Sequence, residues 1–119
     1  MKYNESEETY LETILLLKKN NQEIRSIDIA NNLNYSRASV SRAINLLLKK
    51  QYITIDNGII DFTEEGLALA QNIYERHSTI TQVLIKMGVE EVLAEENACR
   101  IEHVITPEIL EAFKKFLDK

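Results

Sequence analysis

One change of hydrophobic period, at residues 52–62, constrains the fold of this chain most. Residues 52–55 and 59–62 are short runs of β-branched and aromatic side chains, and Asn57-Gly58 lies between them. Asn-Gly between two such runs is typical of a β-hairpin with a tight turn. On both sides of this segment the apolar residues recur at helical spacing instead. The sequence therefore predicts one hairpin within a mainly α-helical protein.

Three helices are predicted before the hairpin. The first covers about residues 6–19, and Ser26 is expected to cap a short second helix. After the turn residues Asn34 and Tyr35, Ser36 is expected to cap a third helix with an apolar face. Two helices joined by a short turn form a helix-turn-helix, and a hairpin directly after them completes a winged helix.

Three further helices are predicted after the hairpin. Thr63 caps a long one that ends at Gly88, the next covers about residues 90–104, and Thr106-Pro107 starts the last. No segment rich in Pro, Gly or Ser separates the two halves. We therefore expect a winged helix followed directly by a helical region.

Charge and length narrow the class of function. The net charge is -5, but residues 24–55 carry five basic side chains against one acidic one, a local +4 that can face a polyanion. A chain of 119 residues is short for a two-lobed enzyme. Its apolar runs of about five residues fall far below the roughly 20 that cross a bilayer, so we expect a cytoplasmic protein without membrane contact.

The start of the third helix carries the candidate DNA contacts. Small hydroxyl side chains let a helix approach DNA closely, and arginine can bind a guanine edge or a phosphate. The candidates are Ser36, Arg37, Ser39 and Arg42. In the alternative, the serines only cap the helix and the arginines are solvated. The preceding helix and the wing favour DNA contact.

A second candidate site lies near the end of the fifth helix. Cys99, Glu102 and His103 stand at positions i, i+3 and i+4, so a thiolate, a carboxylate and an imidazole can converge on one metal ion. The alternative for this triplet is a small core cysteine beside a surface Glu-His pair. His77 alone would be a core histidine, and Glu12 a solvated charge. A hydrolytic Cys-His pair is less well supported, because no oxyanion hole is visible.

Five segments, in order along nearly the whole chain, resemble the diphtheria toxin repressor family and its manganese transport regulator branch. They are residues 6–12, 25–30, 36–42, 73–77 and 98–105. The resemblance implies a winged-helix DNA-binding domain over 1–62 and a helical metal-binding and dimerisation domain over 63–119. It also implies a homodimer that binds palindromic operator DNA when metal is bound and controls genes of metal uptake or homeostasis.

The resemblance also implies a ligand set. Cys99, Glu102 and His103 match the ligands of the family's fifth helix, His77 matches its fourth-helix ligand, and Glu12 matches the first-helix carboxylate of manganese-type members. Thr9 departs from the family, which usually has an Asp or Met ligand at this position. The set implies Mn(II) or Fe(II) as cofactor, since the thiolate is soft and the carboxylates are hard.

Other departures concern the second metal site and the DNA-binding helix. Thr81 and Glu95 stand where iron-type members have ancillary ligands, and Ala38 replaces a common proline. The chain also stops where iron-type members continue into a third domain, as expected of the two-domain form. Two rival functions stay open: a metal-independent winged-helix regulator, and a small metalloenzyme built on the same four ligands of the fourth and fifth helices.

Overall fold

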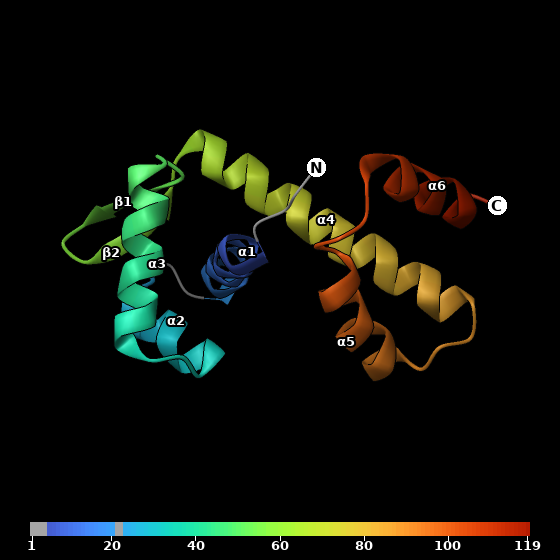
Figure 1. Cartoon of the computed structure of the whole chain (residues 1–119), viewed down its shortest axis with the longest axis horizontal. Helices are drawn as coiled ribbons and strands as arrows, with labels where there is room; N and C mark the ends of the chain where they lie inside the picture. The colour runs from blue at the N-terminus through green and yellow to red at the C-terminus, as the bar shows by residue number, and fades with distance from the viewer. Residues whose placement is uncertain (1–4, 21–22) are drawn as a thin grey trace. The chain divides into compact units, whose positions relative to one another are not determined.

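The computed structural model describes residues 5–20 and 23–119, and within them the chain is mainly helical with one two-stranded sheet (Figure 1). In chain order the elements are α1 (Glu5–Asn20), α2 (Ser26–Leu33), α3 (Arg37–Lys49), β1 (Ile53–Asp56), β2 (Ile59–Phe62), α4 (Glu64–Lys86), α5 (Glu91–Ile101) and α6 (Pro107–Leu117). The predicted fold class is confirmed: a helix-turn-helix with a two-stranded wing precedes a helical region.

The chain divides into two compact units. We call Ser6–Gln71 the N-terminal unit and Asn72–Lys119 the C-terminal unit; the division falls inside α4. The domain boundary predicted between residues 62 and 63 stays a prediction.

In the N-terminal unit, the helix pair α2–α3 packs beside the hairpin. The strands β1 and β2 are antiparallel, with Ile53 opposite Phe62. Ile24 extends this sheet by one bridge to Ile60, and both side chains are fully buried. The apolar face of α3 contacts β1, so burial of these aliphatic side chains holds the helix-turn-helix and the wing together.

Helix starts in the structure test the predicted caps. The hydroxyl of Ser36 accepts from the Ser39 N–H at 3.1 Å, Thr63 accepts from Gly66 at 3.1 Å, and Thr106 accepts from Ile109 at 3.3 Å. These three predicted caps are confirmed.

The predicted cap at Ser26 is wrong, because the N-cap of α2 is Arg25. The Asp28 carboxylate accepts from the Arg25 N–H at 2.8 Å, so the acidic residue in the first turn binds back to the backbone of the N-cap. Helix α2 therefore begins one residue earlier than its cap prediction implied, and Arg25 is fixed at its start.

The predicted hairpin turn is confirmed. Asn57 and Gly58 have φ angles of 53° and 79°, the left-handed conformations that a tight turn between twisted strands requires.

In the C-terminal unit, α5 and α6 pack against α4 around a small apolar core. Its members are Ile80, Ala98, Ile105 and Leu110, with Leu84, Ile101 and Phe113 partly buried against them. Gly88, at φ 101°, follows the end of α4 as predicted. None of the helices in the described ranges is long and apolar enough to cross a membrane.

The helix predicted over residues 90–104 is too long, because α5 ends at Ile101. A proline disfavours helical backbone in the residue before it, so Pro107 holds Thr106 extended and the next helix must start afresh. Glu102 is the C-cap of α5 and keeps helical dihedral angles, whereas His103 lies in the following turn. The spacing of Cys99 and Glu102 along one helical face is therefore retained.

Candidate metal centre and nucleic-acid interface

Glu102 is the most unusual side chain of the C-terminal unit. It is only 1% exposed, and its Oε1 and Oε2 have no hydrogen-bond partner within the described part of the chain. A buried carboxylate without hydrogen bonds is costly unless a cation compensates its charge. The local structure therefore favours a positive group beside Glu102.

His77 and Cys99 stand beside this carboxylate. His77 Nδ1 lies 3.4 Å from Glu102 Oε2 and 3.8 Å from Cys99 Sγ. The Cys99 sulfur and, to a smaller extent, the Glu102 carboxylate raise the pKa of His77 to about 10. This shift has the sign expected where a positive charge is favoured.

The three side chains fit a divalent metal ion. The ligand atoms of His77, Cys99 and Glu102 all lie within 4.8 Å of one another. Imidazole nitrogen, thiolate sulfur and carboxylate oxygen are the donors that first-row transition metals use in proteins. The buried carboxylate oxygens supply the charge that a cation would compensate, so the residues present match the metal that the sequence predicts.

His103 contacts the same carboxylate from its other oxygen. Its Nε2 lies 3.5 Å from Glu102 Oε1, and the side chain is buried. It therefore stands next to the three clustered ligands without sharing their common space. Glu12 lies half-buried on α1 in the N-terminal unit. Its part in the site stays a prediction, as do the ligand roles of the other four residues.

Arg76 is a further residue beside this site that was not predicted from the sequence. This arginine is 3% exposed, and its Nη1 donates to the Glu102 carbonyl at 2.8 Å. The contact satisfies a carbonyl at the end of α5, where intrahelical donors are missing. Arg76 shares a helix face with Ile73 and Ile80, so a charged residue at core spacing was the signal that could have revealed it.

In the N-terminal unit, the predicted DNA-contact residues lie at the start of α3. Ser36, Arg37 and Arg42 are exposed, and Ser39 is half-buried. Ser39 Oγ is 3.0 Å from Ser36 Oγ and accepts from Arg42 Nη2 at 3.3 Å. Ser36 therefore caps the helix, as the alternative interpretation expected, and Ser39 orients Arg42. Contact of these residues with DNA remains a prediction.

The buried and exposed faces of α3 are distinct. Val40, Ile44 and Leu47 face the core, and Arg42 and Asn45 are exposed one turn apart. Asparagine can bind an adenine edge with two hydrogen bonds. Asn45 lies beyond the serine-rich segment, and its spacing of three from Arg42 places it on the same exposed face as a further candidate contact.

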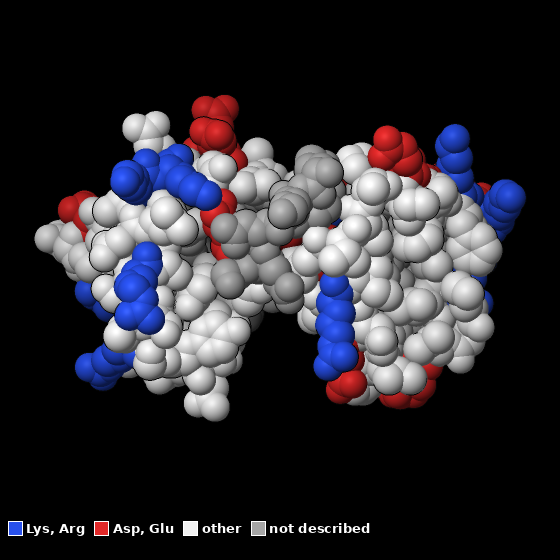
Figure 2. All heavy atoms as spheres, viewed as in Figure 1, with Lys and Arg blue, Asp and Glu red and all other residues white. Residues whose placement is uncertain are grey.

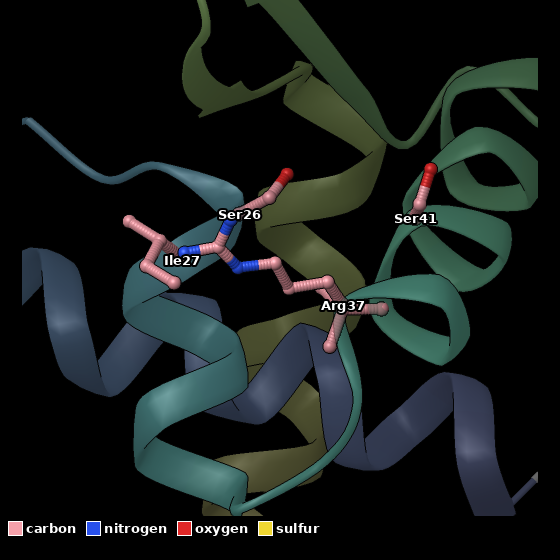
Figure 3. A pocket seen from close by; sticks show the side chains of 5 residues that line it. Ser26, Ile27, Arg37 and Ser41 are labelled. Atoms are coloured by element: carbon pink, nitrogen blue, oxygen red, sulfur yellow. The ribbon is translucent and has the colours of Figure 1, made fainter.

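A groove of about 440 Å³ lies between α2 and α3. Its lining comprises Ser26, Ile27, Arg37, Val40 and Ser41. The Arg37 side chain reaches from the start of α3 toward Ser26 and Ile27 at the start of α2 (Figure 3). Hydroxyl, guanidinium and aliphatic groups therefore share one concave surface beside the candidate DNA contacts.

Positive side chains follow the same helix. Lys and Arg side chains project at intervals from the surface over α3 (Figure 2), as expected from the basic balance of residues 24–55. A polyanion binds such a surface through its phosphates.

Comparison with protein families gives two matches that together cover most of the chain. Residues 2–57 match the family described as iron dependent repressor, N-terminal DNA binding domain. Residues 63–119 match iron dependent repressor, metal binding and dimerisation domain.

Two relatives are similar over nearly the full chain. An HTH-type transcriptional regulator of Methanocaldococcus jannaschii is 36% identical over 119 residues, covering 98% of this chain and 95% of the relative. The transcriptional regulator MntR of Escherichia coli O157:H7 is 32% identical over 112 residues, covering 92% of this chain and 72% of the relative.

Solved structures agree with this fold. The manganese regulator SloR superimposes with a TM-score of 0.83 at 27% identity, covering 99% of this chain and 55% of that chain. IdeR of T. acidophilum gives 0.81 at 27% identity, covering 94% and 54%. This chain therefore spans about half the length of those two proteins.

Proposed function

Because the chain belongs to the iron dependent repressor family, we propose that it is a metal-activated transcriptional repressor that binds operator DNA as a homodimer. This is the diphtheria toxin repressor family expected from the sequence, and its members are DNA-binding regulators, not enzymes. The observation that carries the proposal is the buried Glu102 carboxylate, without hydrogen bonds, beside His77 and Cys99.

The proposed cofactor is Mn(II) or Fe(II). His77, Cys99 and Glu102 would hold the ion, with His103 and Glu12 completing its ligands. The ion supplies the positive charge that compensates the carboxylates. The C-terminal unit contributes a clustered group of donors in which the Glu102 carboxylate is buried, and Arg76 donates to the Glu102 carbonyl.

The proposed DNA contacts are Ser36, Arg37, Ser39 and Arg42. In a homodimer, two α3 helices would read the two halves of a palindromic operator in adjacent major grooves. Residues 1–62 would form the DNA-binding domain and residues 63–119 the metal-binding and dimerisation domain. We place this regulator in the cytoplasm, where it would control genes of metal uptake or homeostasis.

Metal and DNA are linked through Glu12 in this proposal. If Glu12 shares the ion with the ligands of the C-terminal unit, metal binding would favour the DNA-competent state. Coupling of this kind between two ligands typically amounts to about 1–3 kcal/mol. Since linkage is reciprocal, operator DNA should tighten metal binding by the same factor.

A fluorescence anisotropy titration tests this function. The full chain is titrated into a library of labelled palindromic duplexes with EDTA, Mn(II), Fe(II) kept under nitrogen, or Co(II). We expect tight, sequence-selective binding only with metal, and no hydrolytic turnover. Equal binding in EDTA would contradict metal activation and favour a metal-independent regulator.

A matched pair of variants connects that result to the site. Glu102→Gln removes the buried carboxylate, and Glu96→Gln makes the same change at an exposed position of α5. We expect the first to lose metal-stimulated DNA binding and the second to retain it. Sedimentation of both variants checks that the dimer persists, so that a lost dimer is not mistaken for a lost metal site.

A further inference from the structure

The wing of this chain has the wrong charge for a surface beside DNA. Residues 51–62 contain two aspartates and no Lys or Arg. Lys18 of α1 pairs with one of them, its Nζ 3.0 Å from Asp61 Oδ1. The hairpin has no basic residue of its own, so any positive charge beside it comes from other segments of the N-terminal unit.

Arg25 reaches the tip of the hairpin. Its Nη1 donates to the Asn57 carbonyl at 2.9 Å, across 32 positions of sequence. The neighbouring residue Ile24 accepts from the Ile60 N–H at 2.7 Å. Two consecutive residues therefore attach the middle of β2 and the turn to the segment that starts α2.

The absence of a side chain at Gly58 leaves room for the Arg25 guanidinium. A Cβ atom built at this position would lie 2.6 Å from Arg25 Nη1, and the residue has φ 79°. Asn-Gly turns need the second residue in this conformation in any case. The close approach of the guanidinium is an additional constraint that the turn type alone does not impose.

The other end of Arg25 is fixed as well. It is the N-cap of α2, where its backbone N–H donates to Asp28. The residue therefore joins α2 of the helix-turn-helix to the wing through one side chain, while the side chain remains exposed.

From these contacts we propose that Arg25 is a positioning residue for operator binding. It fixes the wing against α2 and brings to the wing tip the positive charge that the hairpin lacks. The wing can then lie along the flank of each half-site instead of being repelled by the phosphates. This inference rests on the proposed DNA-binding function and adds a role that the α3 contacts do not supply.

Hydroxyl-radical footprinting of a selected operator, with the full chain and Mn(II), tests the proposal. Arg25→Met keeps the length of the side chain but removes its charge and its donors. We expect loss of protection at the outer flanks of each half-site, retained protection at the α3 contacts, and about threefold to tenfold weaker binding. Arg25→Lys keeps the positive charge and should restore much of the flank protection. A purely structural contact would not make the protection depend on this charge.

Two controls make the result specific. Lys115→Met removes an exposed charge from α6 in the C-terminal unit and should leave the footprint unchanged. Gly58→Ala keeps Arg25 but displaces its guanidinium and also strains the turn, so it should produce at least the same loss at the flanks. Because both changes break one contact, their effects should be less than additive in the double variant.

Failure of the proposed function and failure of the proposed role of Arg25 give different results. If the parent protein binds no duplex with any metal, the proposed function is contradicted, and this inference with it. If the parent binds but Arg25→Met leaves the flank protection intact, only the role of Arg25 is contradicted. Fully additive effects of Arg25→Met and Gly58→Ala would also overturn it.

Discussion

The two units place their candidate functional residues in opposite environments. In the N-terminal unit, Ser36, Arg37 and Arg42 lie on the surface, and the buried side chains of the same helix are all aliphatic. In the C-terminal unit, Glu102 is 1% and His103 7% exposed, and Arg76 is buried beside them. One site is added to the outside of a core, and the other is built into a core.

This difference shows that stability and function conflict at a buried site more than at an exposed one. Exposed hydroxyl and guanidinium groups remain hydrated, so a DNA-reading surface costs the fold little. A carboxylate buried without hydrogen bonds opposes folding until a cation compensates it. We therefore expect variants of the C-terminal site to separate metal binding from stability, and variants of the N-terminal surface to leave stability unchanged.

The largest effect is expected for Glu102→Met, which tests the buried half of this comparison. Metal affinity should fall about 100-fold or more, because a central ligand is lost. The metal-free protein should stay within about 1 kcal/mol of the parent in stability, since the cost of the buried carboxylate and its pairing with His77 are lost together. Isothermal titration calorimetry and thermal unfolding with and without Mn(II) measure both quantities.

The control for this variant is Glu96→Met, at an exposed position of the same helix. It should change neither metal affinity nor the Mn(II)-dependent rise in Tm. A large loss of stability in metal-free Glu102→Met would show that Glu102 supports the fold itself and would break the comparison.

The second prediction concerns the backbone behind the DNA-reading surface. A Cβ atom on Gly66 would lie 1.8 Å from the Tyr52 carbonyl oxygen, so Gly66→Ala must displace the start of α4 from the backbone that leads into β1. We expect a loss of about 3 kcal/mol in the free energy of unfolding. Urea denaturation measures it.

Gly88→Ala is the matched glycine variant in the C-terminal unit. No atom lies within 4 Å of a Cβ placed there, and only its φ of 101° opposes the change. The cost should be about 1–2 kcal/mol. An equal or larger loss than in Gly66→Ala would show that the packing between α4 and Tyr52 is unimportant.

The third prediction sharpens the exposed half of the comparison. Arg42→Ala should weaken operator binding by about 1–3 kcal/mol while the free energy of unfolding stays within about 0.5 kcal/mol of the parent. Metal affinity in the absence of DNA should also be unchanged. Anisotropy, urea denaturation and calorimetry give the three numbers, and unaltered operator affinity would exclude Arg42 as a contact.

The sequence predicted the parts of the fold that local chemistry determines. The Asn57-Gly58 turn and the caps at Ser36 and Thr106 appear as predicted, because each depends on a few adjacent residues. The cap at Ser26 was wrong because two solutions were available nearby, and the Asp28 carboxylate accepts the Arg25 N–H instead.

Contacts between residues far apart in the sequence could not be predicted as well. The spacing of Cys99 and Glu102 predicts a shared helical face, and the resemblance adds His77. Neither could show that both Glu102 oxygens are buried without hydrogen bonds, because this depends on how α4 and α5 pack. The Arg25–Asn57 and Arg76–Glu102 contacts span 32 and 26 positions, and no local pattern encodes them.

The smallest effect is expected at Cys99, the exposed member of the metal cluster, and it concerns the ranking of metals. If Cys99 coordinates the ion, Co(II) bound to the protein shows a sulfur-to-metal charge-transfer band in the near ultraviolet, and Cys99→Ser abolishes it. Cys99→Glu makes the donor set harder, so activation should shift toward Mn(II) relative to Co(II) or Zn(II). Because Cys99 is exposed, both variants should keep the stability of the parent, in contrast to changes at a buried position.

The side chains of Cys and Glu differ in length, so the ratio of activation by two metals is the diagnostic quantity, not either affinity alone. Absence of the sulfur band, together with an unchanged metal ranking in folded Cys99→Glu, would show that the thiol is not a ligand and that the centre is built from the buried residues alone.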